Sequence, residues 1–357
     1  MKPLCYAPFV NLHWKGSRND AARVGRARPC CDSLSNENAT DFKEKPTLDQ
    51  IWNNPKINEI RETLLRGEWH ESCKLCKEKE IKNGFSGRAS YERDVEKYGL
   101  TIDGGIQMLD YRPSNLCNLK CRMCEPYHSS LLAEEQNDVL NIYDKNTEKD
   151  FLIETLDWSK LKRVKLLGGE PMIMPETLDV LEKVTEECTL QITTNAFKIS
   201  PSIEKKILDC KAKIHFNLSI DAVGDTYDYI RVGSDWNKVK DNVSRLLDYN
   251  RFEISVNPVI MMWNVFNLEE LWDWTESVGV IAENAHWVGQ RWNRAGLLTT
   301  EHKSELIGIH PRLDSAIQEK FFDRDLLLEH WKKETKRNDE LRGTDIRDLD
   351  ERYAEYL

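Results

Sequence analysis

From about residue 105 onward, hydrophobic and polar residues alternate with a two-residue period in short runs. Between these runs, apolar residues recur at helical spacing, as Trp236, Val239, Val243 and Leu247 do. This pattern predicts βα units that build a parallel sheet. The predicted strands lie at residues 106–113, 163–167, 189–195, 213–221, 252–260 and 285–290.

The predicted strands at 213–221 and 252–260 each have an apolar and a polar face. The first places Ile214, Phe216, Leu218 and Ile220 on one side and His215, Asn217, Ser219 and Asp221 on the other. Within a parallel series covered by helices, a polar face indicates a barrel whose interior holds a polar ligand. The alternative is an open doubly wound sheet, which would need apolar residues on both faces.

The rest of the chain does not follow this βα rhythm. Recurrent turn residues and scattered cysteines in residues 1–98 predict a small module held together by metal. Helical patterning with dense charge predicts a C-terminal helical extension at 301–357 that closes one end of the barrel. We therefore predict an α/β protein whose partial (β/α)6 barrel, at residues 99–300, lies between these two parts.

The net charge of −10 disfavours nucleic acid as a partner, because non-specific binding needs cations that neutralise phosphates. The first residues, MKPLCYAPFVNLHW, contain no apolar stretch long enough for a signal peptide. No later segment approaches a membrane-spanning run. We expect a cytoplasmic protein with no membrane partner.

Ten cysteines in such a protein indicate metal or redox chemistry, because the cytosol keeps thiols reduced. Cys188 and Cys210 stand alone and are interpreted as ordinary buried thiols. The other eight lie in groups: Cys5, Cys30 and Cys31, Cys73 and Cys76, and the trio Cys117, Cys121 and Cys124.

The trio has the spacing C-x-x-x-C-x-x-C and follows the first predicted strand, where a barrel places its active-site loops. Three thiolates leave one iron of a cubane cluster open to a ligand that is not protein. An open metal position usually serves chemistry. The alternative is a structural zinc loop, although such loops mostly use two paired C-x-x-C knuckles.

A second motif, Gly168-Gly169-Glu170-Pro171, follows the second predicted strand. Together, the two motifs resemble the signature of the radical S-adenosylmethionine (radical SAM) superfamily. The resemblance implies that Cys117, Cys121 and Cys124 hold a 4Fe-4S cluster whose open iron binds S-adenosylmethionine. It also implies a reducing donor, such as flavodoxin or ferredoxin, and reductive cleavage of the cofactor to a 5′-deoxyadenosyl radical.

The same resemblance suggests which residues contact the cofactor. Gly168, Gly169 and Glu170 match the segment that contacts its amino group. Met123 stands where the superfamily often has an aromatic residue, and its soft side chain can still cover adenine. Arg231 is a candidate partner for the methionine carboxylate, with a surface arginine as the alternative. Candidates at or near strand ends are Thr193, Thr194, Asn195, Ser219, Asp221, Asn257 and Asn264.

The N-terminal cysteines resemble the auxiliary-cluster module called SPASM, or its shortened form twitch. The likeness lies in the order of Cys5, Gly25-x4-Cys30, Asp-Gln-Ile-Trp, an Arg-Gly-Glu segment and Cys73-Lys-Leu-Cys76. These modules usually follow the barrel, whereas here the likeness precedes it. The resemblance implies a second, auxiliary 4Fe-4S cluster bound by Cys5, Cys30, Cys73 and Cys76, with Cys31 either spare or the ligand in place of Cys30. A structural zinc bound by the same thiolates is the alternative.

A fully ligated auxiliary cluster favours net oxidation or cross-linking of the substrate. The resemblance to SPASM and twitch proteins implies a peptide or protein substrate, so we expect an oxidoreductase that acts on one. The alternatives are a dehydrogenase of a small molecule, such as an aminosugar, and a non-catalytic zinc-stabilised binding protein. Five cations either steer an anionic substrate or acidic peptide, or form a solvated loop: Lys15, Arg18, Arg23, Arg26 and Arg28.

Overall fold

The computed structural model describes residues 2–16, 25–33, 40–84, 86–141, 143, 150–282 and 286–357. The chain divides into two compact units. The first unit comprises Met1–Cys117, Pro126–Thr193 and Ser200–Ile214. The second comprises Asn118–Glu125, Thr194–Ile199 and His215–Leu357.

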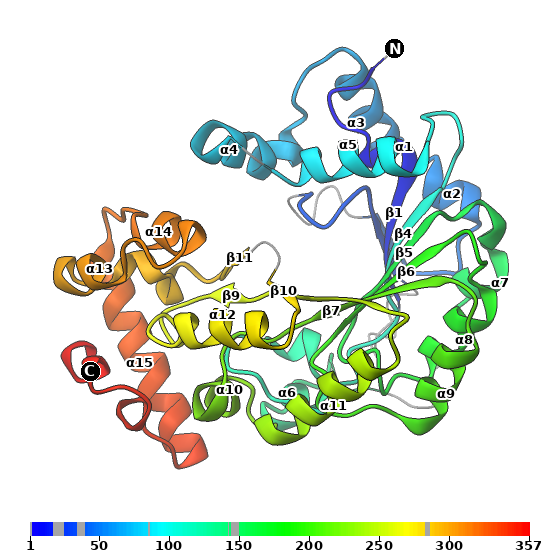
Figure 1. Ribbon diagram of the computed structural model, residues 1–357. Helices are drawn as coiled ribbons and strands as arrows, with labels where there is room; N and C mark the ends of the chain where they lie inside the picture. Colours follow the sequence, from blue (N-terminus) through cyan, green and yellow to red (C-terminus); the bar gives the residue numbers. More distant parts are fainter. Residues whose placement is uncertain are drawn as a thin grey trace. The chain divides into compact units, whose positions relative to one another are not determined.

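The first unit is built on strands in the order β6-β5-β4-β1-β2-β3. Their bounds are β1 (Asn11–Gly16), β2 (Gly25–Arg28), β3 (Thr40–Phe42), β4 (Met108–Arg112), β5 (Arg163–Leu166) and β6 (Thr189–Thr194). β4, β5 and β6 are parallel, as the βα pattern predicts, and run side by side with β1 in Figure 1. β1 also pairs in parallel with β4, while β2 and β3 add antiparallel strands beyond it.

The sheet of the first unit has one apolar and one polar face. Its apolar residues are each at most 1% exposed: Leu12, Trp14, Leu109, Tyr111, Val164, Leu166, Leu190 and Ile192. In register with one another on the opposite face are His13, Asp110, Lys165 and Gln191. The alternation predicted at 213–221 thus extends to these strands.

The helices of the first unit connect and flank these strands. They are α1 (Ala7–Val10), α2 (Leu48–Trp52), α3 (Pro55–Leu65), α4 (Lys74–Asn83), α5 (Gly87–Tyr98), α6 (Ser130–Glu135), α7 (Leu152–Thr155), α8 (Glu176–Lys183) and α9 (Pro201–Asp209). α7, α8 and α9 lie along one side of the strands in Figure 1. A separate cluster of buried side chains joins α1, α3 and α5 and includes Phe9, Ile60, Leu64 and Tyr91.

The strands of the second unit are β7 (Lys213–Leu218), β8 (Glu253–Val256), β9 (Val259–Ile260), β10 (Ile281–Ala282) and β11 (His286–Trp287). The first two residues of β7 are assigned to the first unit. β8 pairs in parallel with β7 and β10, and β9 with β11. The strand predicted at 252–260 is interrupted between Val256 and Val259. Pro258 lies in this gap and has no backbone N–H to donate to a ladder.

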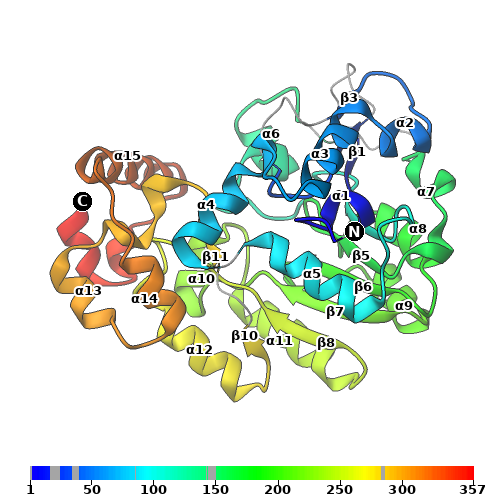
Figure 2. The ribbon, with the colours of Figure 1, turned by 90° about the horizontal axis from the view of Figure 1, so that it is seen from above.

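The helices of the second unit are α10 (Gly224–Ile230), α11 (Trp236–Asp248), α12 (Leu268–Ser277), α13 (Thr300–Leu306), α14 (Pro311–Ile317) and α15 (Arg324–Arg342). The helical spacing noted at residues 236–247 corresponds to α11, which buries Trp236, Val239 and Val243. α12 lies beside β10 (Figures 1 and 2). The fold is therefore mixed α/β with parallel strands, and the predicted fold class is confirmed at this level.

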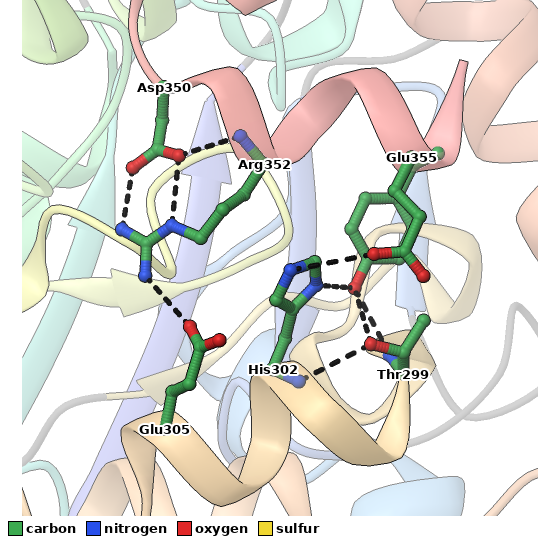
Figure 3. A network of polar contacts seen from close by, with 7 residues as sticks. Thr299, His302, Glu305, Asp350, Arg352 and Glu355 are labelled. Atoms are coloured by element: carbon green, nitrogen blue, oxygen red, sulfur yellow. Dashed lines mark hydrogen bonds and ion pairs between the residues drawn. The ribbon is translucent and has the colours of Figure 1, made fainter.

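The C-terminal residues are fixed by a polar network around His302 (Figure 3). The hydroxyl of Tyr356 lies 2.5 Å from Nδ1 of His302 and accepts a 3.1 Å hydrogen bond from the backbone N–H of Thr299. The Arg352 guanidinium bridges Asp350 and Glu305. The terminus thereby lies beside α13 and α15 (Figures 1 and 2), so the predicted C-terminal extension is an ordered helical part of the second unit.

The domain boundaries at 98 and 300 stay a prediction. Within the first unit, however, the N-terminal residues and the predicted barrel share one sheet through the pairing of β1 with β4. None of the helices in the described part of the chain combines the length and apolar character needed to cross a membrane.

Candidate active site and cysteine cavity

Two of the three clustered cysteines, Cys121 and Cys124, belong to the second unit. Their loop is held by backbone hydrogen bonds from Lys120 N to Val232 O and from Arg122 N to Ile230 O, each 2.9 Å. Cys121 is only 4% exposed. A hydrogen bond with Cys124 lowers the pKa of the Cys121 thiol, burial opposes this, and the Arg231 charge lowers it further. The thiolate, which is the form that binds iron, is thus favoured here.

Arg231 is buried rather than on the surface, at 8% exposure. Its Nη2 lies 2.6 Å from Oδ2 of Asp221, and its Nη1 lies 3.8 Å from Sγ of Cys121. Burial alone would lower the pKa of this guanidinium, but the charges of Asp221 and Cys121 outweigh it and raise that pKa. A permanent cation therefore stands beside the Cys121 thiol. Its contact with a methionine carboxylate stays a prediction.

Asn195 joins the end of β6 to the cysteine loop. Its Nδ2 donates to Oδ1 of Asn118 at 3.0 Å, and its carbonyl accepts from the Tyr227 hydroxyl at 3.1 Å. The neighbouring Thr194 carbonyl accepts from Ser219 N at 2.7 Å. The structure thus brings together three of the predicted cofactor-contacting residues within the second unit.

The asparagines near β8 differ in how their side chains are engaged. Asn264 Nδ2 donates to the carbonyls of Asp221 and Val259, and its Oδ1 accepts from Met261 N. Those bonds hold the turn around residues 259–264, and Asn264 is completely buried. Asn257, by contrast, has a buried Oδ1 with no partner among the described residues. It is the better cofactor candidate of the two.

The Gly-Gly-Glu segment lies against the start of the cysteine loop in the first unit. Gly169 N donates to Ser114 O at 3.1 Å, and Glu170 N to Leu116 O at 2.7 Å. A Cβ atom on Gly169 would stand 2.1 Å from the Leu116 carbonyl oxygen, so only glycine permits this approach. Gly168 has a φ of 145°, which also favours glycine. Glu170 is buried, and its Oε1 accepts from Met172 N at 2.9 Å.

A clamp that the motifs did not indicate holds the cysteine loop from the C-terminal side. The side chain of Arg122 is completely buried and lies over the Tyr229 ring, 3.6 Å from its centroid. Its Nε donates to Tyr229 O at 2.7 Å, and its Nη2 contacts Asp339 and Thr344 at 3.0 and 2.7 Å. Gln290 Nε2 adds a 2.8 Å bond to the carbonyl of Met123.

We expect Arg122→Ala to loosen this loop. Asp339 would lose its buried cationic partner, and unfolding free energy should fall by about 3 kcal/mol, as when one partner of a buried pair is removed. Iron retention after reconstitution should fall with it, and Arg122→Lys should lie between. Denaturation and iron analysis measure both effects. Arg347→Ala, which removes an exposed arginine of the same tail, is the matched control. An Arg122→Ala protein with unchanged stability and iron content would contradict the clamp.

The four N-terminal cysteines predicted to act together line one cavity in the first unit. Cys5, Cys30, Cys73 and Cys76 share its wall with Asp32, Trp69, Ser72, Arg88 and Tyr91. Cys31 is exposed and does not line it. Sequence spacing left Cys30 and Cys31 as alternatives, and only Cys30 faces the cavity.

Burial makes the thiolate forms of these cysteines costly in the absence of a positive partner. It raises the pKa of Cys5 to about 12 and that of Cys76 to about 11, and raises the pKa of Cys30 and Cys73 as well. A bound metal supplies the positive charge that ionises such thiols, so this donor set fits a thiolate-ligated metal group. Within the described ranges, no three His, Cys, Asp or Glu side chains form a group that would hold a single metal ion.

Arg88 ties together the segments that carry these cysteines. Its guanidinium makes two hydrogen bonds to Glu80 of α4, at 2.8 and 3.1 Å, and one of 3.3 Å to the carbonyl of Leu4, next to Cys5. The Cys76 thiol lies 3.8 Å from Oδ2 of Asp32. The cavity is thus bordered by charged side chains as well as by thiols.

Comparison with known proteins agrees with the cysteine loop and its fold. Residues 111–278, which contain the trio and the Gly-Gly-Glu segment, match the model of the radical SAM superfamily. These residues, just under half of the chain, thus form a radical SAM domain.

Curated relatives resemble about half of the chain. A probable GTP 3′,8-cyclase of Methanocaldococcus jannaschii is 23% identical over 50% of this chain and 58% of its own length. The human molybdenum cofactor biosynthesis protein 1 is 25% identical over 50% of this chain and 28% of its own. The chain thus spans little more than half of the first relative and less of the second.

Solved structures show a more distant likeness. The enzyme anSMEcpe with bound AdoMet has a TM-score of 0.39 and 18% identity, covering 51% of this chain and 52% of its own. Streptococcus suis SuiB bound to S-adenosylmethionine has a TM-score of 0.38 and 16% identity, covering 73% and 60%.

Proposed function

We propose that this protein is an enzyme that cleaves S-adenosylmethionine reductively at a 4Fe-4S cluster held by Cys117, Cys121 and Cys124. The observation that carries the proposal is the superfamily match over residues 111–278, which contains all three cysteines. The buried Cys121 thiol, with its pKa lowered by Cys124 and Arg231, supports it. So does the close approach of Gly169 to the cysteine loop.

The chain's own residues hold and orient the cofactors. Cys121 and Cys124 present thiolates, and Arg122 and Gln290 fix the loop between and beside them. Gly168 and Gly169 let backbone approach the cofactor, and Glu170 provides a carboxylate for its amino group. Thr194, Asn195 and Ser219 stand at strand ends for its ribose and carboxylate, and Met123 for its adenine.

We further propose that Cys5, Cys30, Cys73 and Cys76 hold an auxiliary 4Fe-4S cluster of the SPASM or twitch kind. Four thiols spread around the wall of one cavity suit a cubane, whose four irons each take one thiolate. When bound, the two clusters and S-adenosylmethionine supply a radical that abstracts a substrate hydrogen atom and an acceptor for the substrate's remaining electron. A flavodoxin or ferredoxin is the proposed reductant.

The net reaction that we propose is an oxidation. A peptide or protein substrate stays a prediction from the resemblance to SPASM and twitch modules. The names of the curated relatives, GTP 3′,8-cyclases, favour a small molecule instead. We place the small molecule first because those relatives match about half of this chain.

The test is anaerobic reconstitution with iron and sulfide, followed by incubation with S-adenosylmethionine and dithionite. Formation of 5′-deoxyadenosine, measured by mass spectrometry, is the expected result. A fully reconstituted protein that forms none would overturn the proposed activity. Zinc in place of iron at both cysteine groups would favour the binding-protein alternative.

A further inference from the structure

The polar face of the first unit's sheet carries a row of side chains that cross five strands. Opposite one another in register stand Arg28 of β2, His13 of β1, Asp110 of β4, Lys165 of β5 and Gln191 of β6. Residues in register on neighbouring strands project from the same face. Two positions further along β4, Arg112 lies on this face too. With Arg28 and Lys165 of the row, Arg112 makes three cations on this face.

The single carboxylate in the row is already fully engaged. Asp110 Oδ1 lies 3.2 Å from Nη2 of Arg163, and its Oδ2 accepts from the Tyr91 hydroxyl at 3.2 Å. Asn11 donates to the same oxygen at 3.4 Å. Arg163 also pairs with Asp94. Asp110 thus belongs to a buried network, and the nearby charge of Lys165 helps to lower its pKa without forming a direct ion pair.

His13 does not add to the positive charge of the row. It is buried, with Nδ1 3.8 Å from Oδ2 of Asp110. Burial lowers the pKa of His13 more than the nearby carboxylate raises it. The neutral imidazole therefore separates the Arg28 cation from the Asp110 network.

Three cations on this face lack a direct ion pair in the part of the chain that the structure describes. Arg28, Arg112 and Lys165 are all half-buried and form no ion pair there. The Nε–H of Arg28 is buried and has no hydrogen-bond acceptor among the described residues. By contrast, Arg26 pairs with Asp41, and Lys15 lies 3.4 Å from the centre of the Tyr127 ring. Of the predicted basic loop, Arg18 and Arg23 lie outside the described residues.

These cations adjoin the segment that carries Cys30. Arg28 lies two residues before Cys30, which lines the cysteine cavity. Strand register places Arg112 and Lys165 on the same face of the sheet as Arg28. An anion held by them would lie near that cavity.

We propose that Arg28, Arg112 and Lys165 form a binding site for a small molecule that carries phosphate groups. Two guanidinium forks and one ammonium suit phosphate oxygens, which accept bidentate bonds from arginine. Strands are about 4.8 Å apart, so the cations spread over roughly 10 to 15 Å of sheet, the scale of a polyphosphate rather than a single phosphate. This site names the class of substrate for the proposed function. Its role in turnover rests on that function.

The test is equilibrium binding of inorganic tripolyphosphate to the full-length, reconstituted protein by calorimetry. We expect salt-sensitive binding and, for Arg112→Gln and Lys165→Gln, weakening of about tenfold each, because each removes one charge-assisted contact. Lys205→Gln removes one exposed lysine of α9 and should leave the affinity unchanged. Melting temperatures of all three variants should match that of the parent protein.

The test does not depend on cofactor cleavage, so its outcome is separate from that of the 5′-deoxyadenosine assay. Absence of tripolyphosphate binding in a protein that cleaves S-adenosylmethionine would overturn the site and leave the proposed activity standing. If Lys205→Gln weakened tripolyphosphate binding equally, the effect would come from net charge alone, and the proposed site would be contradicted. Preference for an acidic hexapeptide over tripolyphosphate would overturn the phosphate assignment in favour of a peptide.

Discussion

Replacement of Cys121 by alanine is expected to lower the rate of 5′-deoxyadenosine formation at least about a thousandfold, because residues that act as one catalytic unit fail together when one is removed. Cys121 is the buried cysteine of the trio and the one that lies beside both Cys124 and Arg231. Without it, a cubane would have two protein ligands in place of three. Of about eight irons in a fully loaded protein, about four should be lost.

The matched control for this variant is Cys188→Ala. Cys188 is also completely buried, and burial raises the pKa of its thiol to about 12, so it is not poised as a thiolate. Iron content and cofactor cleavage should match those of the parent protein. Persistent cleavage in Cys121→Ala would show that the radical is generated elsewhere.

Replacement of Cys76 by alanine is expected to remove the other half of the iron while leaving cofactor cleavage measurable. Cys76 lines the cavity with Cys5, Cys30 and Cys73, and it lies beside Asp32. A cubane that has lost one of four thiolates should be unstable, so about four irons should remain and electron paramagnetic resonance should show one cluster signal. Net oxidation of substrate should fall more strongly than 5′-deoxyadenosine formation.

Cys31→Ala is the control, because Cys31 is exposed and adjoins Cys30 without lining the cavity. It should retain both cluster signals. If Cys31→Ala lost iron and Cys76→Ala did not, the ligand set would be wrong. Zinc at one equivalent in the parent protein, with iron for a single cluster, would instead favour the structural-zinc alternative.

Strands with a strong alternation were predictable from the sequence, and those without it were not. The runs at 106–113, 163–167, 189–195 and 213–221 contain β4 to β7, and the bounds agree to within three residues at each end. β1 was missed because its residues do not follow the βα pattern and lie among the turn residues and cysteines of residues 1–98. In the structure both its polar and its apolar residues are buried, from Asn11 to Trp14. β10 has only two residues, too few for any period.

The cysteine positions identified the candidate site, whereas its supporting contacts depend on distant parts of the chain. Nothing near Arg122 in the sequence indicates that Asp339 and Thr344, more than 200 residues away, bind its side chain. Cys30 and Cys31 are equivalent in spacing, and only the path of the chain after β2 separates them. The cations Arg112 and Lys165 likewise become neighbours only through strand register.

The pairing of β1 with β4 has a consequence for how the protein is made. Asn11 stands opposite Met108, so β1 leaves the ribosome long before its parallel partner exists. At about 5 to 20 residues per second, the delay is several seconds or more. During that time Cys5, Cys30, Cys73 and Cys76 have emerged, but the sheet that positions Cys30 is incomplete. Metal loading at these cysteines should therefore follow synthesis of β4, and truncated chains that end before Met108 should bind iron poorly.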